Sequence, residues 1–454
     1  MTQIIKPVRK ALGGIHPAYH KELARDAAIS ELPVSKALRV SMAQHLGAPA
    51  KANVKKGDVV LRGQKIGDAA GFISSPVHSP TSGKVVDVAE DITASGTRAQ
   101  AVLIEPDGQD QWSPSLPPAL NWETIDGPAL ITRVAESGIA GMGGAGFPTH
   151  VKLSPPKDKT IDILIINGAE CEPFLTADFR LMVEEAGRVW TGCQIIRRIL
   201  NAKTIRVAIE DNKPEAIAAM EKAMAGAGGD TAIVVLPTSY PQGAEKQQIF
   251  AITGREVPSG GLPMDVSTVV ENVGTAAAVC DAVLRGCPLV ERVTTVTGTP
   301  VVQPGNLRSR LGTPFADLVA ACGGTRGAVA KIVAGGPMMG LAQFGMEVCT
   351  TKTTSGLLLL PPNDVSVFES APCISCGRCV EACPMRLMPC DLSQMLEAED
   401  YLGAESMNVL DCIECGCCAY CCPSRRPLVQ HMRSGKARAM LRRKQQQQKA
   451  EKKA

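Results

Sequence analysis

The sequence predicts a multidomain protein of the α/β class. The chain of 454 residues is too long for one ordinary hydrophobic core. Short β-rich segments dominate its first quarter, and apolar strands alternating with helical patterns follow them. In addition, 11 of the 17 cysteines lie after residue 370. The C-terminal part is therefore expected to be a separate, cysteine-dependent module.

Composition excludes several classes of protein. With 45% hydrophobic and 20% charged residues, the chain is neither disordered nor fibrous. Only 3% of residues are aromatic, which argues against stacking platforms for nucleic acid, so we expect no nucleic-acid partner. The first 14 residues lack the apolar core of a signal peptide, and the longest apolar runs, 161–166 and 357–360, are too short to span a bilayer. We expect a cytoplasmic protein whose clustered cysteines bind metal rather than form disulfides.

An N-terminal segment, residues 1–30, precedes an expected all-β domain at residues 31–110. The phrase from Val54 to Ile66, followed by Ser79–Val85, resembles the lipoyl/biotinyl barrel-sandwich family. That family carries a modified lysine at the tip of a hairpin, whereas the corresponding tip here, Ile73–His78, has no lysine. We therefore interpret this domain as a scaffold rather than a swinging-arm carrier.

A polar, proline-rich linker at 110–120 leads into an expected α/β domain at residues 121–288. Apolar runs typical of buried strands occupy 161–166 and 231–236, and helical patterns occupy 176–200 and 213–226. Such alternation implies a mostly parallel sheet. Residues 290–345 return to short strands around one helix, Pro314–Cys322.

Two cysteine runs share one spacing. Cys373–Pro384 and Cys412–Pro423 each fit C-x₂-C-x₂-C-x₃-C-P, in which closely spaced thiolates converge on a cubane and the fourth cysteine turns toward the other cluster. Residues 363–430 are therefore expected to form an α-helical ferredoxin domain with two [4Fe–4S] clusters. By this crossing rule, the ligands of one cluster are Cys373, Cys376, Cys379 and Cys422, and those of the other are Cys412, Cys415, Cys418 and Cys383.

A pair of zinc sites is the alternative for these cysteines. Zinc sites rarely repeat four such closely spaced cysteines twice, each time ending in proline, so the iron–sulfur interpretation is favoured. Three further cysteines lie off the pattern and are interpreted as packing residues or spare thiols: Cys390, Cys417 and Cys421.

A glycine-rich stretch, Gly141–Lys152, precedes the first apolar strand of the α/β region. Four glycines within six positions let the backbone approach a phosphate or a flat ring, although the spacing differs from the dinucleotide fingerprint and a plain turn is an alternative. The strand at 161–166 then runs into Asn167-Gly-Ala-Glu170-Cys-Glu172. Two carboxylates thus stand at the carboxyl end of a parallel strand, where open α/β sheets bind ligands. They could accept hydrogen bonds from a nucleotide or only cap the next helix.

Four motifs follow one another in an order that carries a family resemblance: Gly143–Lys152, Asn167–Pro173, Gly243–Glu245 and Asn272–Thr275. They resemble the flavin- and NADH-binding subunit of respiratory complex I. More closely, residues 10–430 resemble the RnfC family of the Rnf (Rsx) ion-translocating electron transport complexes. This resemblance implies a barrel-sandwich domain, a complex-I-like flavin domain, a β-grasp SLBB domain at 290–345 and the two-cluster ferredoxin domain, in that order.

The resemblance also implies cofactor residues. The FMN site would comprise Gly143, Gly144, Ala145, Gly146, Lys152, Asn167, Asn272 and Thr275. The nicotinamide nucleotide would face Phe147, Glu170, Glu172 and Glu245, with Phe147 stacking on a ring. The sequence departs from complex I at Met142, where the complex I motif has an arginine, and the loss of that cation weakens attraction for phosphate. No catalytic side chain is assigned, because the cofactors supply the chemistry.

The function implied by the resemblance is that of a translocase subunit. NADH would deliver a hydride to FMN, and single electrons would pass through the clusters to membrane-bound, iron–sulfur or flavin subunits of the same complex, or flow in reverse. The chain would be peripheral on the cytoplasmic side of the cell inner membrane. Two alternatives stay open: a corrinoid reductase of the propanediol-utilisation type, and a non-catalytic electron-transfer adaptor, which Met142 keeps under consideration.

The C-terminal residues 431–454 are strongly basic. Residues 433–454 contain nine Lys or Arg against Glu451, a net +8, which leaves −5 on the rest of a chain whose total is +3. We expect a disordered tail. The functional alternative is attraction to an anionic membrane surface, worth about 1 kcal/mol per basic residue.

Overall fold

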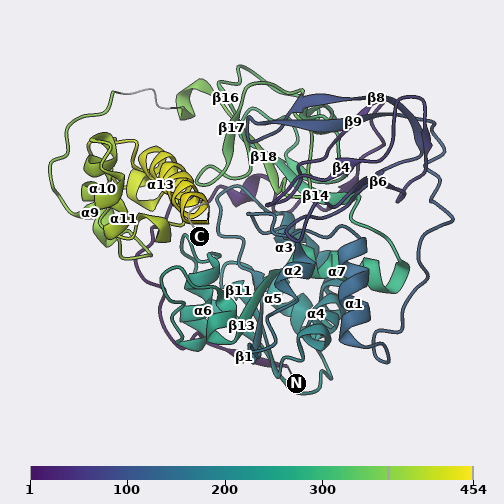
Figure 1. The fold of residues 1–454 in the computed structure, drawn as a ribbon, viewed down its shortest axis with the longest axis horizontal. Helices are drawn as coiled ribbons and strands as arrows, with labels where there is room; N and C mark the ends of the chain where they lie inside the picture. The colour runs from purple at the N-terminus through teal and green to yellow at the C-terminus, as the bar shows by residue number, and fades with distance from the viewer. Residues whose placement is uncertain (1, 366–368, 452–454) are drawn as a thin grey trace. The chain divides into compact units, whose positions relative to one another are not determined.

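The computed structural model describes residues 2–365 and 369–451 (Figure 1). The chain divides into two compact units. The first unit contains Met1–Lys6, Tyr19–Leu236 and Ser267–Val365, and the second contains Pro7–Ala18, Pro237–Val266 and Ser366–Ala454.

A five-stranded parallel sheet forms the centre of the first unit. Its strands lie in the order β1 (Gln3–Ile5), β12 (Asp230–Leu236), β11 (Thr204–Glu210), β10 (Ile163–Gly168) and β13 (Thr268–Asn272). The central strands are almost fully buried, as expected of a parallel sheet covered on both faces. The prediction of a parallel α/β sheet is confirmed.

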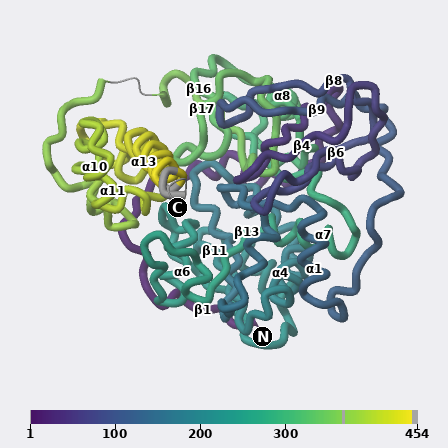
Figure 2. The backbone as a smooth tube through the Cα atoms, in the orientation of Figure 1, coloured from purple at the N-terminus to yellow at the C-terminus, as the bar shows by residue number. Residues whose placement is uncertain are grey.

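Six helices belong to this α/β core: α1 (Gly127–Glu136), α2 (Thr149–Lys152), α3 (Ala177–Glu184), α4 (Ala186–Leu200), α5 (Pro214–Ala223) and α7 (Val273–Arg285). Figure 2 shows α1, α4 and α7 side by side. Helices α4 and α7 approach closely because Gly192 has no Cβ. A Cβ at that position would overlap the carbonyl oxygen of Ala276. The single helix expected at 176–200 is interrupted at Glu185, whose backbone leaves the helical region.

The barrel-sandwich domain consists of two small antiparallel sheets. One contains β3 (Leu38–Ser41), β9 (Arg98–Pro106), β8 (Gly83–Ile92) and β5 (Val59–Val60), and the other contains β4 (Lys51–Ala52), β6 (Lys65–Asp68) and β7 (Val77–His78). Side chains such as Val40, Ile66 and Val102 form their shared core.

The SLBB region forms a six-stranded mixed sheet. Its strand order is β17 (Leu341–Gln343), β16 (Lys331–Ala334), β18 (Gly356–Leu360), β14 (Glu291–Thr297), β15 (Gly305–Arg310) and β2 (Ile29–Glu31). Helix α8 (Phe315–Ala321) buries Phe315, Leu318 and Val319 in the core of this domain. Strand β2 comes from the N-terminal segment and β18 follows residue 345, so the sheet uses chain from both sides of the expected domain.

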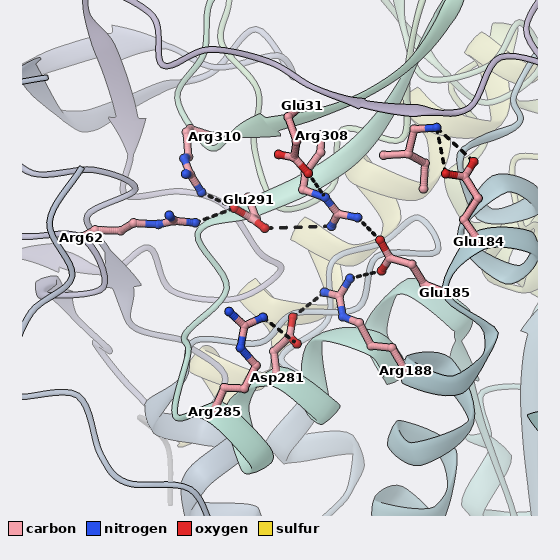
Figure 3. Close-up of polar contacts among 11 residues, drawn as sticks. Glu31, Arg62, Glu184, Glu185, Arg188, Asp281, Arg285, Glu291, Arg308 and Arg310 are labelled. Atoms are coloured by element: carbon pink, nitrogen blue, oxygen red, sulfur yellow. Dashed lines mark hydrogen bonds and ion pairs between the residues drawn. The ribbon is translucent and has the colours of Figure 1, made fainter. Parts of the chain in front are cut away.

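An ionic network joins these three domains of the first unit (Figure 3). Arg62 of the barrel-sandwich domain bonds Asp110 at 2.9 Å and Glu291 of the SLBB sheet at 2.8 Å. From the SLBB sheet, Arg308 bonds Glu185 between α3 and α4. The network also contains Glu31, Arg310, Arg188, Asp281 and Arg285. Positive and negative side chains alternate along the network, which explains how so many charges are accommodated at a partly buried junction.

The second unit is mainly helical. It contains α6 (Glu245–Thr253), α9 (Arg378–Glu381), α10 (Pro389–Glu397), α11 (Tyr401–Ser406), α12 (Cys417–Tyr420) and α13 (Leu428–Glu451). Its apolar core gathers Leu387, Leu392, Leu396, Val409 and Met432.

The basic C-terminal residues differ from the expected disordered tail, because α13 is helical as far as Glu451. Met432 and Ala439 are buried against the unit, which anchors the helix, and the Gln, Lys, Arg and Ala residues beyond them favour helix. Lys452 and Lys453 lie outside the described residues. Among the residues that the structure describes, no helix is both long and apolar enough to cross a membrane.

Candidate cofactor sites

The glycine-rich stretch forms a closed loop between α1 and α2. Its ends are joined by a bridge between Ala140 and Pro148, and the N–H of Gly141 donates to the carbonyl of Phe147 at 2.8 Å. The backbone of residues 143–145 is exposed. At Gly144, where φ is 144°, no described residue other than its two chain neighbours has an atom within 4 Å of the position that a Cβ would occupy. The loop therefore presents bare backbone to open space, as a phosphate or ring requires.

This loop lies against the start of α7. The N–H of Met142 donates to Thr275 Oγ1 at 3.0 Å, and Gly143 is so close to Asn272 that a Cβ would lie 3.1 Å from its side chain. Asn272 caps α7 by accepting from the N–H groups of Gly274 and Thr275. The structure thus brings together Gly143, Asn272 and Thr275, at a helix N-terminus that favours an anion.

Two polar residues beside the loop complete this region. Asn167 is the next-to-last residue of β10 and accepts from the N–H of Ala169 at 3.1 Å, while Lys152 ends α2. Thr149, directly after the loop, is 1% exposed, and its Oγ1 has no hydrogen-bond partner among the described residues. An orphaned buried hydroxyl beside exposed glycine backbone fits a bound phosphate-bearing cofactor such as FMN.

The two carboxylates after β10 bond to backbone. Glu170 accepts from the N–H groups of Asp178 and Phe179 at 2.8 and 3.1 Å, so it caps α3. Glu172 accepts from Met338 and Met339 at 3.1 and 2.7 Å, in the tight loop of the SLBB domain. Burial raises the pKa of Glu172 to about 6. The capping role that the sequence left as an alternative is therefore the role that Glu170 has in this structure.

The two remaining residues expected to face the nucleotide belong to different units of the chain. Phe147 is half-buried in the glycine-rich loop of the first unit. Glu245 is the first residue of α6 and belongs to the second unit.

In the second unit, two cavities of about 20 Å³ lie among the cysteines. The lining of one includes Cys383, Cys412, Cys415 and Cys418 together with Cys417, and that of the other includes Cys373, Cys376, Cys379 and Cys422 together with Cys390. Each cavity thus gathers one of the crossed sets expected from the spacing, with its fourth cysteine taken from the other run, and one off-pattern cysteine.

The backbone around the two cysteine sets repeats itself. Ser375, Gly377 and Arg386 adopt left-handed conformations, and their counterparts one repeat later, Glu414, Gly416 and Arg425, do the same. These turns let N–H groups donate to sulfur at 3.4 Å, from Ser375 to Cys373 Sγ and from Glu414 to Cys412 Sγ. Such N–H donors stabilise a negatively charged cluster, so the residues fit two [4Fe–4S] centres.

Comparison with known proteins agrees with this geometry. Family models match the RnfC barrel sandwich hybrid domain at residues 10–109, the Nuo51 FMN-binding domain at 134–281, the SLBB domain at 293–342 and the 4Fe-4S dicluster domain at 366–423. The RnfC-type member of the proton-translocating ferredoxin:NAD(+) oxidoreductase complex of Clostridium ljungdahlii is 48% identical, covering 93% of this chain and 92% of the relative. The chain belongs to the RnfC family.

Other RnfC relatives are nearly as similar. The corresponding protein of the Na(+)-translocating ferredoxin:NAD(+) oxidoreductase complex of Acetobacterium woodii is 44% identical, covering 93% of this chain and 96% of the relative. Its counterpart in the ion-translocating oxidoreductase complex of Rhodobacter capsulatus is 44% identical, covering 94% and 82%. The predicted family and fold class are confirmed, and the matched domains support FMN and iron–sulfur clusters as cofactors.

One departure from the complex I motif has a structural explanation in this RnfC protein. The side chain of Met142 is 7% exposed and packs toward Gly274 at the start of α7, so it points into the protein rather than toward the open face of the loop. An arginine in that conformation would bury its charge. An anion at this loop would therefore rely on backbone N–H groups and the α7 terminus rather than on residue 142.

Sequence reasoning missed Lys21. Its Nζ bonds to three carbonyl oxygens of the segment after β10 that carries Glu170 and Glu172. No pattern in the sequence singles out this lysine, because its partners lie about 150 positions away in the chain.

Proposed function

We propose that this chain is the peripheral subunit in which FMN exchanges two electrons with NAD(H) and single electrons with two [4Fe–4S] clusters. The observation that carries the proposal is the presence in one chain of an FMN-binding fold with an open glycine loop and of two crossed sets of four cysteines. Relatives named as parts of ferredoxin:NAD(+) oxidoreductase complexes support the choice of substrates.

Bound FMN would supply the conversion between a two-electron hydride and two single electrons. The exposed backbone of Gly143–Ala145 and the N-terminus of α7 would hold its phosphate and ring, with Lys152 as a nearby cation. Thr149 would donate its otherwise unpartnered hydroxyl proton. Asn272 orients this region, since its Oδ1 caps α7 while its Nδ2 donates to Asp178 at 2.7 Å.

The nicotinamide nucleotide would bind beside the loop, with Phe147 as the stacking ring and Glu170 and Glu172 as acceptors for its hydroxyl or amide groups. Because Glu172 holds two backbone N–H groups of the SLBB loop, nucleotide binding at Glu172 would compete with that contact. Such competition gives the SLBB domain a direct part in nucleotide binding.

The two clusters differ in exposure, which suggests their order. Around the set that contains Cys376, that thiol is exposed and Ile374 is 66% exposed. In the other set, the equivalent Cys415 is only 7% exposed. We assign the exposed cluster to electron exchange with partner subunits, because electron transfer between proteins needs a cofactor close to the surface.

The chain would dock on integral membrane subunits at the cytoplasmic face of the cell inner membrane, and ion translocation would belong to those partners. The exposed basic residues of α13 would add attraction to anionic lipid. Deleting residues 440–454 should therefore weaken binding to vesicles that contain anionic lipid, and unchanged binding would argue against a membrane role for α13.

Membership of the RnfC family disfavours the corrinoid reductase. Relatives named as parts of ferredoxin:NAD(+) oxidoreductase complexes disfavour the non-catalytic adaptor that Met142 left open. Anaerobic purification with iron, sulfide and flavin analysis tests the proposal. Two cubanes require about eight irons per chain, and NADH should bleach the flavin absorbance. Stoichiometric zinc would refute the cluster assignment, and a flavin-loaded protein that NADH does not reduce would refute the dehydrogenase role.

A further inference from the structure

Lys21 makes an unusual set of contacts in the first unit. It begins a short 3-10 helix, Lys21–Leu23, and its Nζ lies 2.8 Å from the carbonyl oxygen of Glu170, 2.9 Å from that of Glu172 and 2.5 Å from that of Leu175. An ammonium has three protons and no acceptor, so this geometry uses all of its donors on one segment of chain.

That segment, residues 169–176 between β10 and α3, is an irregular stretch of backbone. Glu170 and Phe174 adopt left-handed conformations, at φ of 47° and 69°, which are costly for residues with side chains. Three of its carbonyl oxygens converge on one point, where only a donor with several protons can satisfy them. Removing the ammonium would leave these buried acceptors unpaired.

Neighbours of Lys21 bind the same segment. The N–H of Phe174 donates to the carbonyl of Tyr19 at 2.7 Å, and the rings of His20 and Phe174 stack with their centroids 4.8 Å apart. Residues 19–21 therefore hold this segment through a backbone bond, a ring contact and three bonds to one ammonium.

The segment carries two of the side chains that we assign to the nucleotide. Glu170 and Glu172 project from the backbone whose carbonyls Lys21 binds, so a shift of that backbone displaces both carboxylates. The glycine-rich loop makes none of its described hydrogen bonds to Lys21 and is held instead by α7 and by its own closing bonds. Lys21 also lies outside the matched FMN-binding domain, residues 134–281.

We propose that Lys21 is a positioning residue for NAD(H): it fixes the segment 169–176 so that the nucleotide binds, without contributing to FMN or cluster binding. The inference rests on the proposed function. It predicts that loss of the ammonium weakens nucleotide binding selectively, because the glycine-rich loop is held by contacts that do not involve Lys21.

The test compares Lys21→Met, which keeps length but removes the donor, with Lys21→Arg and with the matched control Lys36→Met at an exposed lysine of the same unit. Flavin-loaded holoprotein is used throughout. We expect Lys21→Met to raise the KM for NADH and the Kd for NAD⁺ at least tenfold, with kcat, FMN and iron content changed less than twofold. Hydrogen exchange should accelerate within 169–176. Lys21→Arg should rescue only partly, because a planar guanidinium cannot direct three donors at one point.

The outcomes separate the two levels of the argument. If wild-type holoprotein binds NADH and Lys21→Met binds it equally well, this inference is overturned and the proposed function stands. If wild-type holoprotein does not bind NADH, both fail. If Lys21→Met loses FMN together with nucleotide affinity, the residue has a general structural role and the positioning inference is overturned. Should Lys21→Met not accumulate as folded protein, the KM and exchange data for Lys21→Arg decide in the same way.

Discussion

Replacing Gly146 by alanine should distort the glycine-rich loop and weaken FMN binding through two separable effects. At this residue φ is 67°, a conformation that costs a residue with a Cβ about 1–2 kcal/mol. The new Cβ would also lie 2.5 Å from Thr353 Cγ2, well inside van der Waals contact. Thr353 cannot easily rotate away, because β-branched side chains have few rotamers and its Oγ1 bonds Thr351 Oγ1 at 3.0 Å. The carbonyl of Gly146 is itself tied to the N–H of Leu46 at 2.9 Å.

The magnitude follows from these two costs. Relieving an overpacked contact typically costs about 1–3 kcal/mol, so the total for Gly146→Ala is roughly 2–5 kcal/mol. Since about 1.4 kcal/mol is a factor of ten, the Kd for FMN should rise roughly five- to sixtyfold if half of this cost falls on the bound form of the loop. Quenching of FMN fluorescence measures that Kd directly.

A second substitution separates the effects. Thr353→Ser removes the clashing methyl group and keeps the hydroxyl, so the double variant should recover the part of the loss due to the clash and retain the part due to φ. The control is Gly187→Ala in α4, where a Cβ meets open space. It should leave the Kd for FMN unchanged. Wild-type FMN affinity in Gly146→Ala would refute the reasoning, and no recovery in the double variant would refute the clash.

Three further predictions concern the clusters, a buried lysine and the helix packing. Cys376→Ala should lower the iron content from about eight to about four per chain without loss of FMN, whereas Cys417→Ala should keep all the iron; retention of eight irons in Cys376→Ala would contradict its ligand role. Burial lowers the pKa of Lys352 to about 7 from 10.5, so between these values the unfolded chain binds more protons and stability rises with pH, by at most about 1.4 kcal/mol per pH unit. Urea unfolding of Lys352→Met should lack this contribution, and parallel pH profiles for the two proteins would exclude it. Gly192→Ala should destabilise the first unit by about 1–3 kcal/mol, because its Cβ would overlap the carbonyl of Ala276, and an unchanged melting temperature would show that α4 and α7 separate freely.

The sequence predicts best what depends on local spacing. The parallel strands follow from apolar runs such as 161–166, and the crossed cysteine sets follow from two short repeats. Proline after each fourth cysteine predicts that this cysteine binds the cluster of the other run. In these cases the information lies within a dozen residues, so a single sequence contains it.

Structural features that depend on residues far away in the chain could not be predicted from the local sequence. The break at Glu185 coincides with its bonds to Arg188 and to Arg308 in another domain, whereas the local pattern favours one continuous helix. Strand β2 pairs with β15 almost 280 residues later. The C-terminal helix was missed because charge and glutamine content suggested disorder, while burial of Met432 and Ala439 provides the anchor that composition does not reveal.

The barrel-sandwich domain gains a specific role from these contacts. Its hairpin tip has no lysine, as the sequence indicated, but the carbonyl of Pro76 at that tip accepts from Lys352 Nζ at 2.8 Å. The backbone N–H of Lys352 donates to Gln44 Oε1 in the same domain. The next residue, Thr353, is the one that contacts Gly146, and Leu46 bonds the carbonyl of Gly146. The domain therefore supports the glycine-rich loop from two directions. If that loop binds FMN as proposed, variants that break the contacts of this domain with Lys352 should weaken FMN binding, although they lie outside the FMN-binding domain.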